Sequence, residues 1–123
     1  MKRLEHVGIM VKDLDQSIQF YQEAFGLVLR RRQFLNEAVE LAFLHFPEQA
    51  DMEIELVAGR SMDVVEGLVN HLAFRVDHIA EEIERLTNMG VEMVDAEPRL
   101  ILGDVKIAFF KGPNGEKLEL VER

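Results

Sequence analysis

Two histidines and two glutamates recur in register along this chain. His6 and His71 are 65 residues apart, and Glu55 and Glu119 are 64 residues apart. Imidazole nitrogens and carboxylate oxygens together suit Ni²⁺, Co²⁺, Mn²⁺, Fe²⁺ or Zn²⁺, and four such ligands without thiolates leave coordination positions open. A single histidine or glutamate in a strand is usually structural or solvated, but the repetition favours a metal site that performs chemistry.

The repeat extends beyond these four residues. Gly26 matches Gly90, the run Leu41–Phe43 returns as Ile107–Phe109, and Glu55–Val57 returns as Glu119–Val121. Short repeats in many copies indicate solenoids, whereas two copies of a long unit indicate one domain built from two modules. We therefore predict a single domain over residues 1–123, with module 1 at about 1–58, a linker at about 59–69 and module 2 at about 70–123.

Composition limits the class of protein. The chain has 123 residues, 48% of them hydrophobic and 30% charged, which is typical of a globular domain. Its net charge of −9 leaves no basic surface for nucleic acid or an anionic membrane. The Arg30–Arg32 run is interpreted as a solvated strand, with a binding site for an anionic substrate tail as the alternative.

The absence of cysteine excludes disulfides and thiol catalysis. The absence of a signal-like or membrane-length apolar run predicts that the protein is cytoplasmic.

The first module has the pattern of strand, helix and three strands. Alternation predicts a strand over 4–11, and helical spacing predicts a helix that Asp13 or Asp15 caps and Gly26 ends. Strands are predicted near 27–34, 38–46 and 52–57, with turns near Asn36 and over 47–51.

The second module repeats this order. A strand over 71–76 leads to a helix that Asp77 caps and Gly90 ends. Strands follow near 91–94, 100–101, 105–110 and 117–121, and residues 112–115 form the hairpin turn between the last two. The linker has the spacing of one helical turn through Met62, Val65 and Leu68.

Strand alternation places the four candidate ligands on the faces away from the helices. If each sheet curls, the four side chains converge in a cleft, where two carboxylates would be costly to bury without a cation. Phe43, Phe109 and Met10 are the predicted lining of this cleft. His45 and His78 lie outside the repeat and are interpreted as surface or turn histidines.

Several segments together resemble one known superfamily over essentially the whole chain. They are His6–Ile9, Val11–Leu14, Phe25–Leu27, the strand from His71 and the closing Gly112–Gly115 with Leu118–Leu120. The chain is similar here to the vicinal oxygen chelate superfamily. The resemblance implies an α+β fold in which two βαβββ modules form a cup-shaped open β-barrel around one metal, usually in a homodimer. This is the glyoxalase/bleomycin-resistance/dioxygenase fold.

The order His, Glu, His, Glu resembles bacterial-type glyoxalase I, or lactoylglutathione lyase, which isomerises the hemithioacetal of methylglyoxal and glutathione. The resemblance implies that His6, Glu55, His71 and Glu119 bind a divalent metal, which binds both oxygens of a small α-oxo or hemithioacetal substrate. A proton would then move through a metal-bound enediolate. The resemblance favours Glu119 as the base, with Glu55 as the alternative.

Two departures concern the glutathione carboxylate. The glyoxalase pattern has arginine at the position of Met10 and asparagine near Ala58 and Gly59. Arg75 lies four residues after His71 and in phase with it. We hypothesise that Arg75 binds a substrate anion, and an outward arginine paired with an acidic neighbour is the alternative.

Other members of the superfamily are alternatives. The segment Asp95–Arg99 and the opening strand are similar to methylmalonyl-CoA epimerase, although Glu55 stands where that family commonly has glutamine. A drug-binding protein without catalysis is a second alternative, which the complete ligand set disfavours. Ring-cleaving dioxygenases and antibiotic thiol transferases generally use three ligands, so Glu55 disfavours both.

Overall fold

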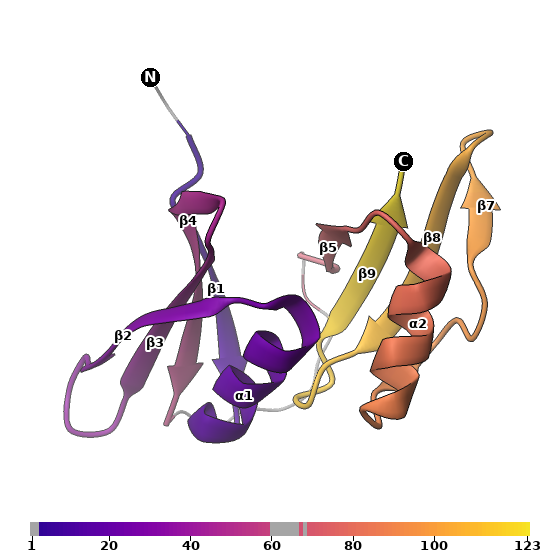
Figure 1. The fold of residues 1–123 in the computed structure, drawn as a ribbon. Helices are drawn as coiled ribbons and strands as arrows, with labels where there is room; N and C mark the ends of the chain where they lie inside the picture. The colour runs from indigo at the N-terminus through magenta and orange to yellow at the C-terminus, as the bar shows by residue number, and fades with distance from the viewer. Residues whose placement is uncertain (1–2, 60–66, 68) are drawn as a thin grey trace. The chain divides into compact units, whose positions relative to one another are not determined.

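The computed structural model describes residues 3–59, 67 and 69–123 of the chain (Figure 1). The chain divides into two compact units, residues 1–63 and 64–123, and each is described by itself. The predicted helical turn through Met62, Val65 and Leu68 lies outside the described residues. Within the described part of the chain, neither helix has the length and apolar character needed to cross a membrane.

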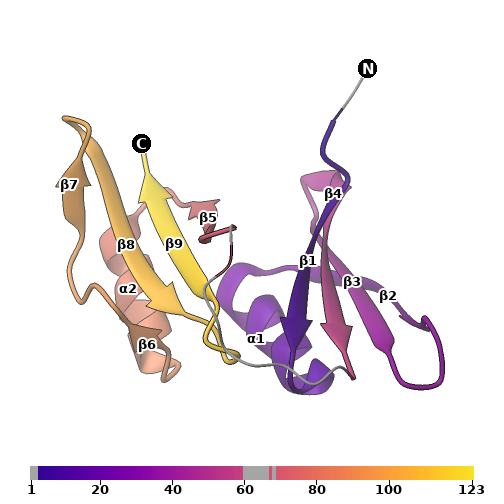
Figure 2. The same ribbon diagram turned by 180° about the vertical axis from the view of Figure 1, so that it is seen from behind.

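The first unit is a four-stranded sheet with one helix. Its elements are β1 (His6–Val11), α1 (Leu14–Phe25), β2 (Val28–Phe34), β3 (Glu40–Phe46) and β4 (Gln49–Ala58). The strand order is β1-β4-β3-β2, as Figure 2 shows from behind, with β1 parallel to β4 and the other pairs antiparallel. The first and last strands of the unit are therefore neighbours.

Helix α1 packs on one face of this sheet through residues at helical spacing. Leu14, Ile18 and Tyr21 are buried in α1, and Leu44 and Leu56 are buried in the strands beneath. Asp13 is the N-cap, because its carboxylate accepts a hydrogen bond from the backbone N–H of Gln16 at 3.0 Å. The helix ends at Gly26, whose φ of 71° suits glycine.

The hairpin between β3 and β4 is tighter than predicted. Phe46 pairs with Gln49, so the turn consists of Pro47 and Glu48, and the predicted loop over 47–51 was wrong for its last three residues. Two-residue turns join antiparallel strands directly. The polar residues in Gln49–Asp51 favoured a loop, but this segment is an exposed extension of β4.

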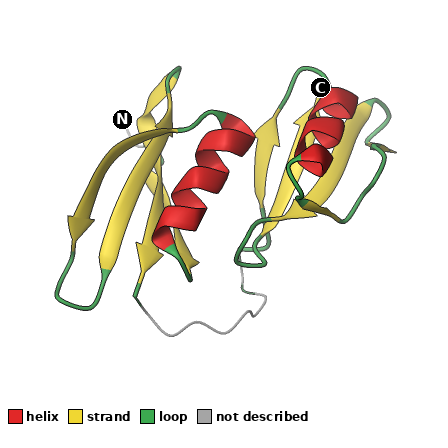
Figure 3. Cartoon of the chain, turned by 60° about the horizontal axis from the view of Figure 1, so that its bottom comes forward, coloured by secondary structure: helices red, strands yellow, loops and turns green. Residues whose placement is uncertain are grey.

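The second unit repeats the same topology. Its elements are β5 (Leu72–Arg75), α2 (Ile79–Asn88), β6 (Glu92–Met93), β7 (Arg99–Ile101), β8 (Val105–Lys111) and β9 (Lys117–Glu122). The sheet order is β5-β9-β8-β6, β7 also pairs with β8, and β5 is parallel to β9. Two short strands thus occupy the position that β2 has in the first unit. Figure 3 shows the helix of each unit against its own sheet. The predicted α+β fold of two modules is confirmed.

Two turns of the second unit agree with prediction. The β8–β9 hairpin turns at 112–115, where the Gly112 N–H donates to the carbonyl of Glu116 at 2.9 Å. Gly115 there has a φ of 88°, and Gly90 after α2 has a φ of 87°. Both values lie in the left-handed region that glycine adopts without a steric cost.

The start of α2 corrects the prediction that Asp77 caps it. His78 occupies the N-cap position and its side chain makes no capping bond. The backbone N–H of Ile79 instead donates to the Glu122 carboxylate at 2.9 Å. An acceptor on a neighbouring strand replaces the local one, which sequence spacing does not reveal.

Glu122 should make the free energy of unfolding decrease as the pH becomes acidic. The hydrogen bond from Ile79, together with Lys106, lowers the pKa of Glu122 from its ordinary value of 4.5. A group with a lowered folded-state pKa stabilises the fold above that ordinary value and loses this contribution as the pH falls through the folded-state pKa. We expect Glu122→Gln to show a smaller loss of unfolding free energy between about pH 6 and about pH 3 than the wild type.

Urea unfolding at both pH values measures this difference. The matched control is Glu84→Gln, which removes an exposed glutamate from α2, the helix that the Glu122 carboxylate caps. This variant should leave the pH dependence unchanged. Equal pH dependence in Glu122→Gln and the wild type would contradict the role of Glu122.

Candidate functional site

The parallel pairing of β1 with β4 brings His6 to Glu55. Gly8 is the Cα partner of Glu55, and alternation puts His6 and Glu55 on the sheet face opposite α1. The Nε2 atom of His6 lies 3.1 Å from a carboxylate oxygen of Glu55, whose side chain is 17% exposed. The first histidine and the first glutamate therefore meet as the alternation predicts.

The second unit contains the same pair. Ala73 in β5 is the Cα partner of Glu119 in β9, and His71 immediately precedes β5. The Nε2 atom of His71 lies 3.6 Å from a carboxylate oxygen of Glu119, whose side chain is 11% exposed. Each unit thus places one imidazole nitrogen beside one largely buried carboxylate.

Both histidines have a partner for the other ring nitrogen. The Nδ1 atom of His6 lies 2.9 Å from the Glu5 carboxylate, and the Nδ1 atom of His71 lies 2.9 Å from the side-chain oxygen of Asn70. With Nδ1 protonated and donating to these oxygens, the Nε2 lone pair is free to bind a cation. The bond to Glu5, helped by the charge of Glu55 and opposed by desolvation, raises the pKa of His6.

These pairs fit a divalent metal. Consider two ligand atoms that bind the same ion, each at about 2.1 Å. They lie roughly 3.0 Å apart when the ligand–ion–ligand angle is a right angle, and roughly 3.4 Å apart when it is tetrahedral. The observed separations of 3.1 and 3.6 Å are close to these values. Within residues 3–59, 67 and 69–123, no group of three or more potential ligands forms a complete metal site. The four-residue site therefore remains a prediction that rests on two observed pairs.

Arg75 shares the face of β5 with Ala73 but lies at the opposite end of the strand from His71. Its guanidinium donates a hydrogen bond to the backbone carbonyl of Arg123 at 2.9 Å. Four strand positions correspond to about 13 Å between the Cα atoms of His71 and Arg75. The role of Arg75 in binding a substrate anion stays a prediction.

The two phenylalanines predicted to line the cleft lie beside the candidate carboxylates. Phe43 is the Cα partner of Glu55, and Phe109 is the Cα partner of Glu119. The ring of His71 meets the Phe109 ring edge-on, with 5.3 Å between centroids. Met10 lies on the His6 face of β1 and is exposed.

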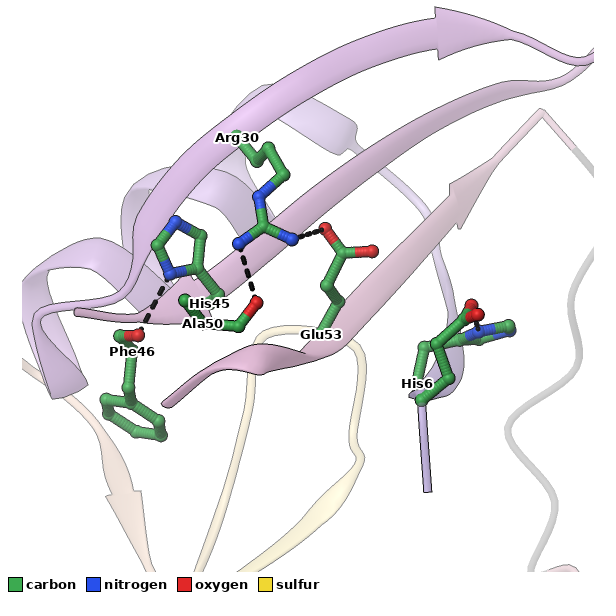
Figure 4. Close-up of polar contacts among 7 residues, drawn as sticks. His6, Arg30, His45, Phe46, Ala50 and Glu53 are labelled. Atoms are coloured by element: carbon green, nitrogen blue, oxygen red, sulfur yellow. Dashed lines mark hydrogen bonds and ion pairs between the residues drawn. The ribbon is translucent and has the colours of Figure 1, made fainter. Parts of the chain in front are cut away.

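The histidines outside the repeat differ from each other. His78 is exposed at the start of α2, as predicted. His45 lies within β3, half-buried, with its Nδ1 atom 2.9 Å from the backbone carbonyl of Phe46 (Figure 4). His45 is therefore a strand residue and not a turn residue, and it is only partly exposed at the surface.

The arginine run is engaged by acidic side chains. Arg30 donates to the buried carboxylate of Glu53 at 2.7 Å and to the Ala50 carbonyl at 2.8 Å (Figure 4). Arg32 pairs with Asp15 and Glu40. These contacts were not predicted, because the partners lie in other elements.

A cation near Phe109 was also missed. The Lys117 ammonium lies 4.6 Å from the Phe109 ring centroid, and the Arg99 guanidinium lies 5.6 Å from it. Asp95 holds both Phe109 and Arg99 in place. Its carboxylate accepts a hydrogen bond from the Phe109 backbone N–H at 2.8 Å and forms an ion pair with Arg99 at 3.1 Å. The spacing of Lys117 two residues before Glu119 was the available signal.

The second unit has a cavity of about 530 Å³ that is separate from the His71–Glu119 pair. It is lined by the first turn of α2 and by Glu97, Pro98, Leu100, Lys106 and Glu122. None of the predicted site residues lines this cavity, so the cavity is not the candidate metal site.

Several known proteins are similar to this chain. A sequence model of the Glyoxalase/Bleomycin resistance protein/Dioxygenase superfamily matches residues 5–109. The uncharacterized protein YwbC of Bacillus subtilis is 38% identical over 99% of this chain and 98% of its own length. A lactoylglutathione lyase of Escherichia coli is 33% identical over 98% of this chain and 92% of its own length.

A solved structure shares the fold at similar identity. A variant of glyoxalase I from Zea mays superposes with a TM-score of 0.85 and 31% identity over 98% of this chain. The chain spans 44% of that maize chain, which is less than half its length.

Proposed function

The chain belongs to the glyoxalase/bleomycin resistance protein/dioxygenase superfamily, and we propose that it is a metal-dependent lyase/isomerase of the glyoxalase I type. The observation that carries this proposal is the repeated contact between a histidine Nε2 atom and a glutamate carboxylate, at 3.1 Å and 3.6 Å. The substrate is a small α-oxo compound or hemithioacetal. The proposal includes a cytoplasmic homodimer, which the family resemblance favours.

In this proposal His6, Glu55, His71 and Glu119 hold one divalent ion, with Ni²⁺, Co²⁺, Mn²⁺, Fe²⁺ and Zn²⁺ as the candidates. A bound ion would act as a Lewis acid and make the carbon-bound hydrogen of the substrate more acidic. The largely buried carboxylates support this assignment, because burying them without a cation is unfavourable.

The protein's own part of the reaction is proton transfer. One glutamate accepts the proton from the hydroxyl-bearing carbon of the substrate, and the C–H electron pair enters an enediolate. The same glutamate returns the proton to the adjacent carbon, while the hydroxyl proton moves to the oxygen of that carbon. We assign this role to Glu119, with Glu55 as the alternative. The distance to the partner histidine is longer for Glu119, at 3.6 Å, than for Glu55, at 3.1 Å, and this difference favours Glu119.

Epimerase and binding functions are the competing proposals. The segment Asp95–Arg99 favoured an epimerase by resemblance, but Asp95 binds the Phe109 backbone and Arg99, which gives this segment a structural role. A binding protein would need no proton transfer at Glu119. The metal and substrate measurements below distinguish these functions.

The test begins with elemental analysis of the purified protein and titration with Ni²⁺ and Co²⁺. We expect about one ion per chain, and weaker binding in His6→Ala and His71→Ala. His78→Ala is the matched control, because it removes an exposed histidine outside the pairs. Turnover of the methylglyoxal–glutathione hemithioacetal would support the proposal, and proton exchange only in methylmalonyl-CoA would indicate the epimerase. Failure to bind metal would overturn the enzyme proposal and leave a binding protein.

A further inference from the structure

The two units carry opposite charges beside their histidines. Glu53 is the Cα partner of His6 in the β1–β4 pair. Leu72 pairs with Leu118, and extending that register by one residue sets Lys117 opposite His71. Glu53 forms an ion pair with Arg30 at 2.7 Å, so its charge is already balanced. The equivalent position in the second unit therefore holds a cation where the first unit holds a neutralised anion.

Lys117 faces the same aromatic ring as the candidate ligands of its unit. Its ammonium lies 4.6 Å from the Phe109 centroid, and His71 contacts the same ring at 5.3 Å. Phe109 is the Cα partner of Glu119, which shares its face of β9 with Lys117. The Lys117 ammonium and the His71 imidazole thus both contact the Phe109 ring, and Glu119 occupies the strand position paired with Phe109.

The charge of Lys117 is not balanced by a carboxylate within the described residues. No ion pair there includes Lys117, whereas Lys106 pairs with Glu122 at 3.6 Å and Arg99 pairs with Asp95 at 3.1 Å. Lys117 as a whole residue is half-buried. A cation over an aromatic ring gains about 0.5–1 kcal/mol at exposed sites, and the ring leaves the positive charge available to an anion.

We propose that Lys117 binds a carboxylate of the substrate, within a few bonds of the carbon that loses its proton. The inference rests on the proposed function and specifies its substrate class as a small anionic α-oxo compound or its thiol adduct. Residues two apart in a strand have Cα atoms about 7 Å apart. An anion on Lys117 and a carbon at Glu119 therefore belong to one small molecule.

Arg31 is the corresponding cation of the first unit and is less well placed. Its guanidinium lies 4.1 Å from the Phe43 centroid, but β3 separates Arg31 from Glu55. Two strand spacings amount to about 10 Å. Arg31 thus provides a matched control, since it is a cation over an equivalent ring but farther from the carboxylate.

The test compares two chelators with the same metal-binding group. Acetohydroxamate is neutral beyond that group, whereas malonohydroxamate carries a carboxylate. Calorimetric titration of the Ni²⁺-loaded protein should show about tenfold tighter binding of malonohydroxamate, the size expected for a partly exposed charge-assisted hydrogen bond. Lys117→Met should remove this preference while acetohydroxamate affinity persists, Lys117→Arg should retain much of it, and Arg31→Met should leave it intact.

The outcomes separate this inference from the proposed function. Equal affinity of the wild type for both chelators, or equal loss of preference in Arg31→Met and Lys117→Met, would overturn the inference while the metal site stands. A wild-type protein that binds no Ni²⁺ would overturn the proposed function, and the inference with it. Circular dichroism of each variant confirms that the fold is retained before the titrations are compared.

Discussion

Replacing Glu119 with glutamine is expected to lower kcat for the hemithioacetal by about 10²–10⁴-fold, the range for loss of a positioned general base. The amide keeps the shape of the carboxylate and one metal-binding oxygen, but it is far too weak a base to accept a carbon-bound proton. Metal binding should weaken less than catalysis, because the other three proposed ligands would remain.

The comparison with Glu55→Gln makes this prediction specific. Both variants lose one carboxylate from an equivalent histidine pair, at 3.1 Å for Glu55 and 3.6 Å for Glu119. With Ni²⁺ saturating in both, kcat should fall further in Glu119→Gln, and exchange of the substrate proton with deuterated solvent should nearly cease. A larger loss in Glu55→Gln would assign the base to Glu55 instead.

Replacing Phe110 with alanine is expected to destabilise the protein by about 3–5 kcal/mol, as for other buried phenylalanines. Phe110 is 0% exposed in the second unit. Its loss removes apolar contacts and leaves a cavity that the surrounding strands cannot close. Small domains have a total stability of about 5–15 kcal/mol, so this variant should unfold at a markedly lower urea concentration.

Phe34→Ala is the matched control for this prediction. Phe34 is 65% exposed, so the same change of side chain should cost less than about 0.5 kcal/mol there. Urea unfolding of both variants, followed by circular dichroism, gives the two free energies. A cost at Phe110 no greater than the cost at Phe34 would contradict the packing of the second unit.

The order of the elements could be predicted because it depends on local patterns. Alternation identified the strands, helical spacing identified both helices, and Gly26 and Gly90 marked their ends. The errors occurred where a distant residue decides the local structure. Glu122 on β9 replaces Asp77 at the start of α2, and the pairing of Phe46 with Gln49 turns a polar predicted loop into strand.

Within the candidate site, the two histidine–glutamate pairs could be predicted from the same local patterns. Strand alternation placed His6 on the face of Glu55 and His71 on the face of Glu119, and both pairs are in contact. The surroundings of these pairs could not be predicted, because long side chains reach across strands. Arg30 meets Glu53 from two strands away. Lys117 meets Phe109 from the adjacent strand.

The parallel strand pairs also determine when each ligand pair can form as the chain folds. His6 and Glu55 lie on the first and last strands of their unit, 49 residues apart in the sequence, whereas β3 and β4 are joined by a two-residue turn. Closing the longer loop has the greater entropic cost, and contacts between distant residues form slowly. The hairpin should therefore form early and the histidine–glutamate contact late.

An ion that needs both residues of a pair would then bind after the transition state for folding. It would stabilise the native state by mass action and slow unfolding, with little effect on the folding rate. The same parallel pairing that assembles the ligands would thus make a bound metal a source of kinetic stability.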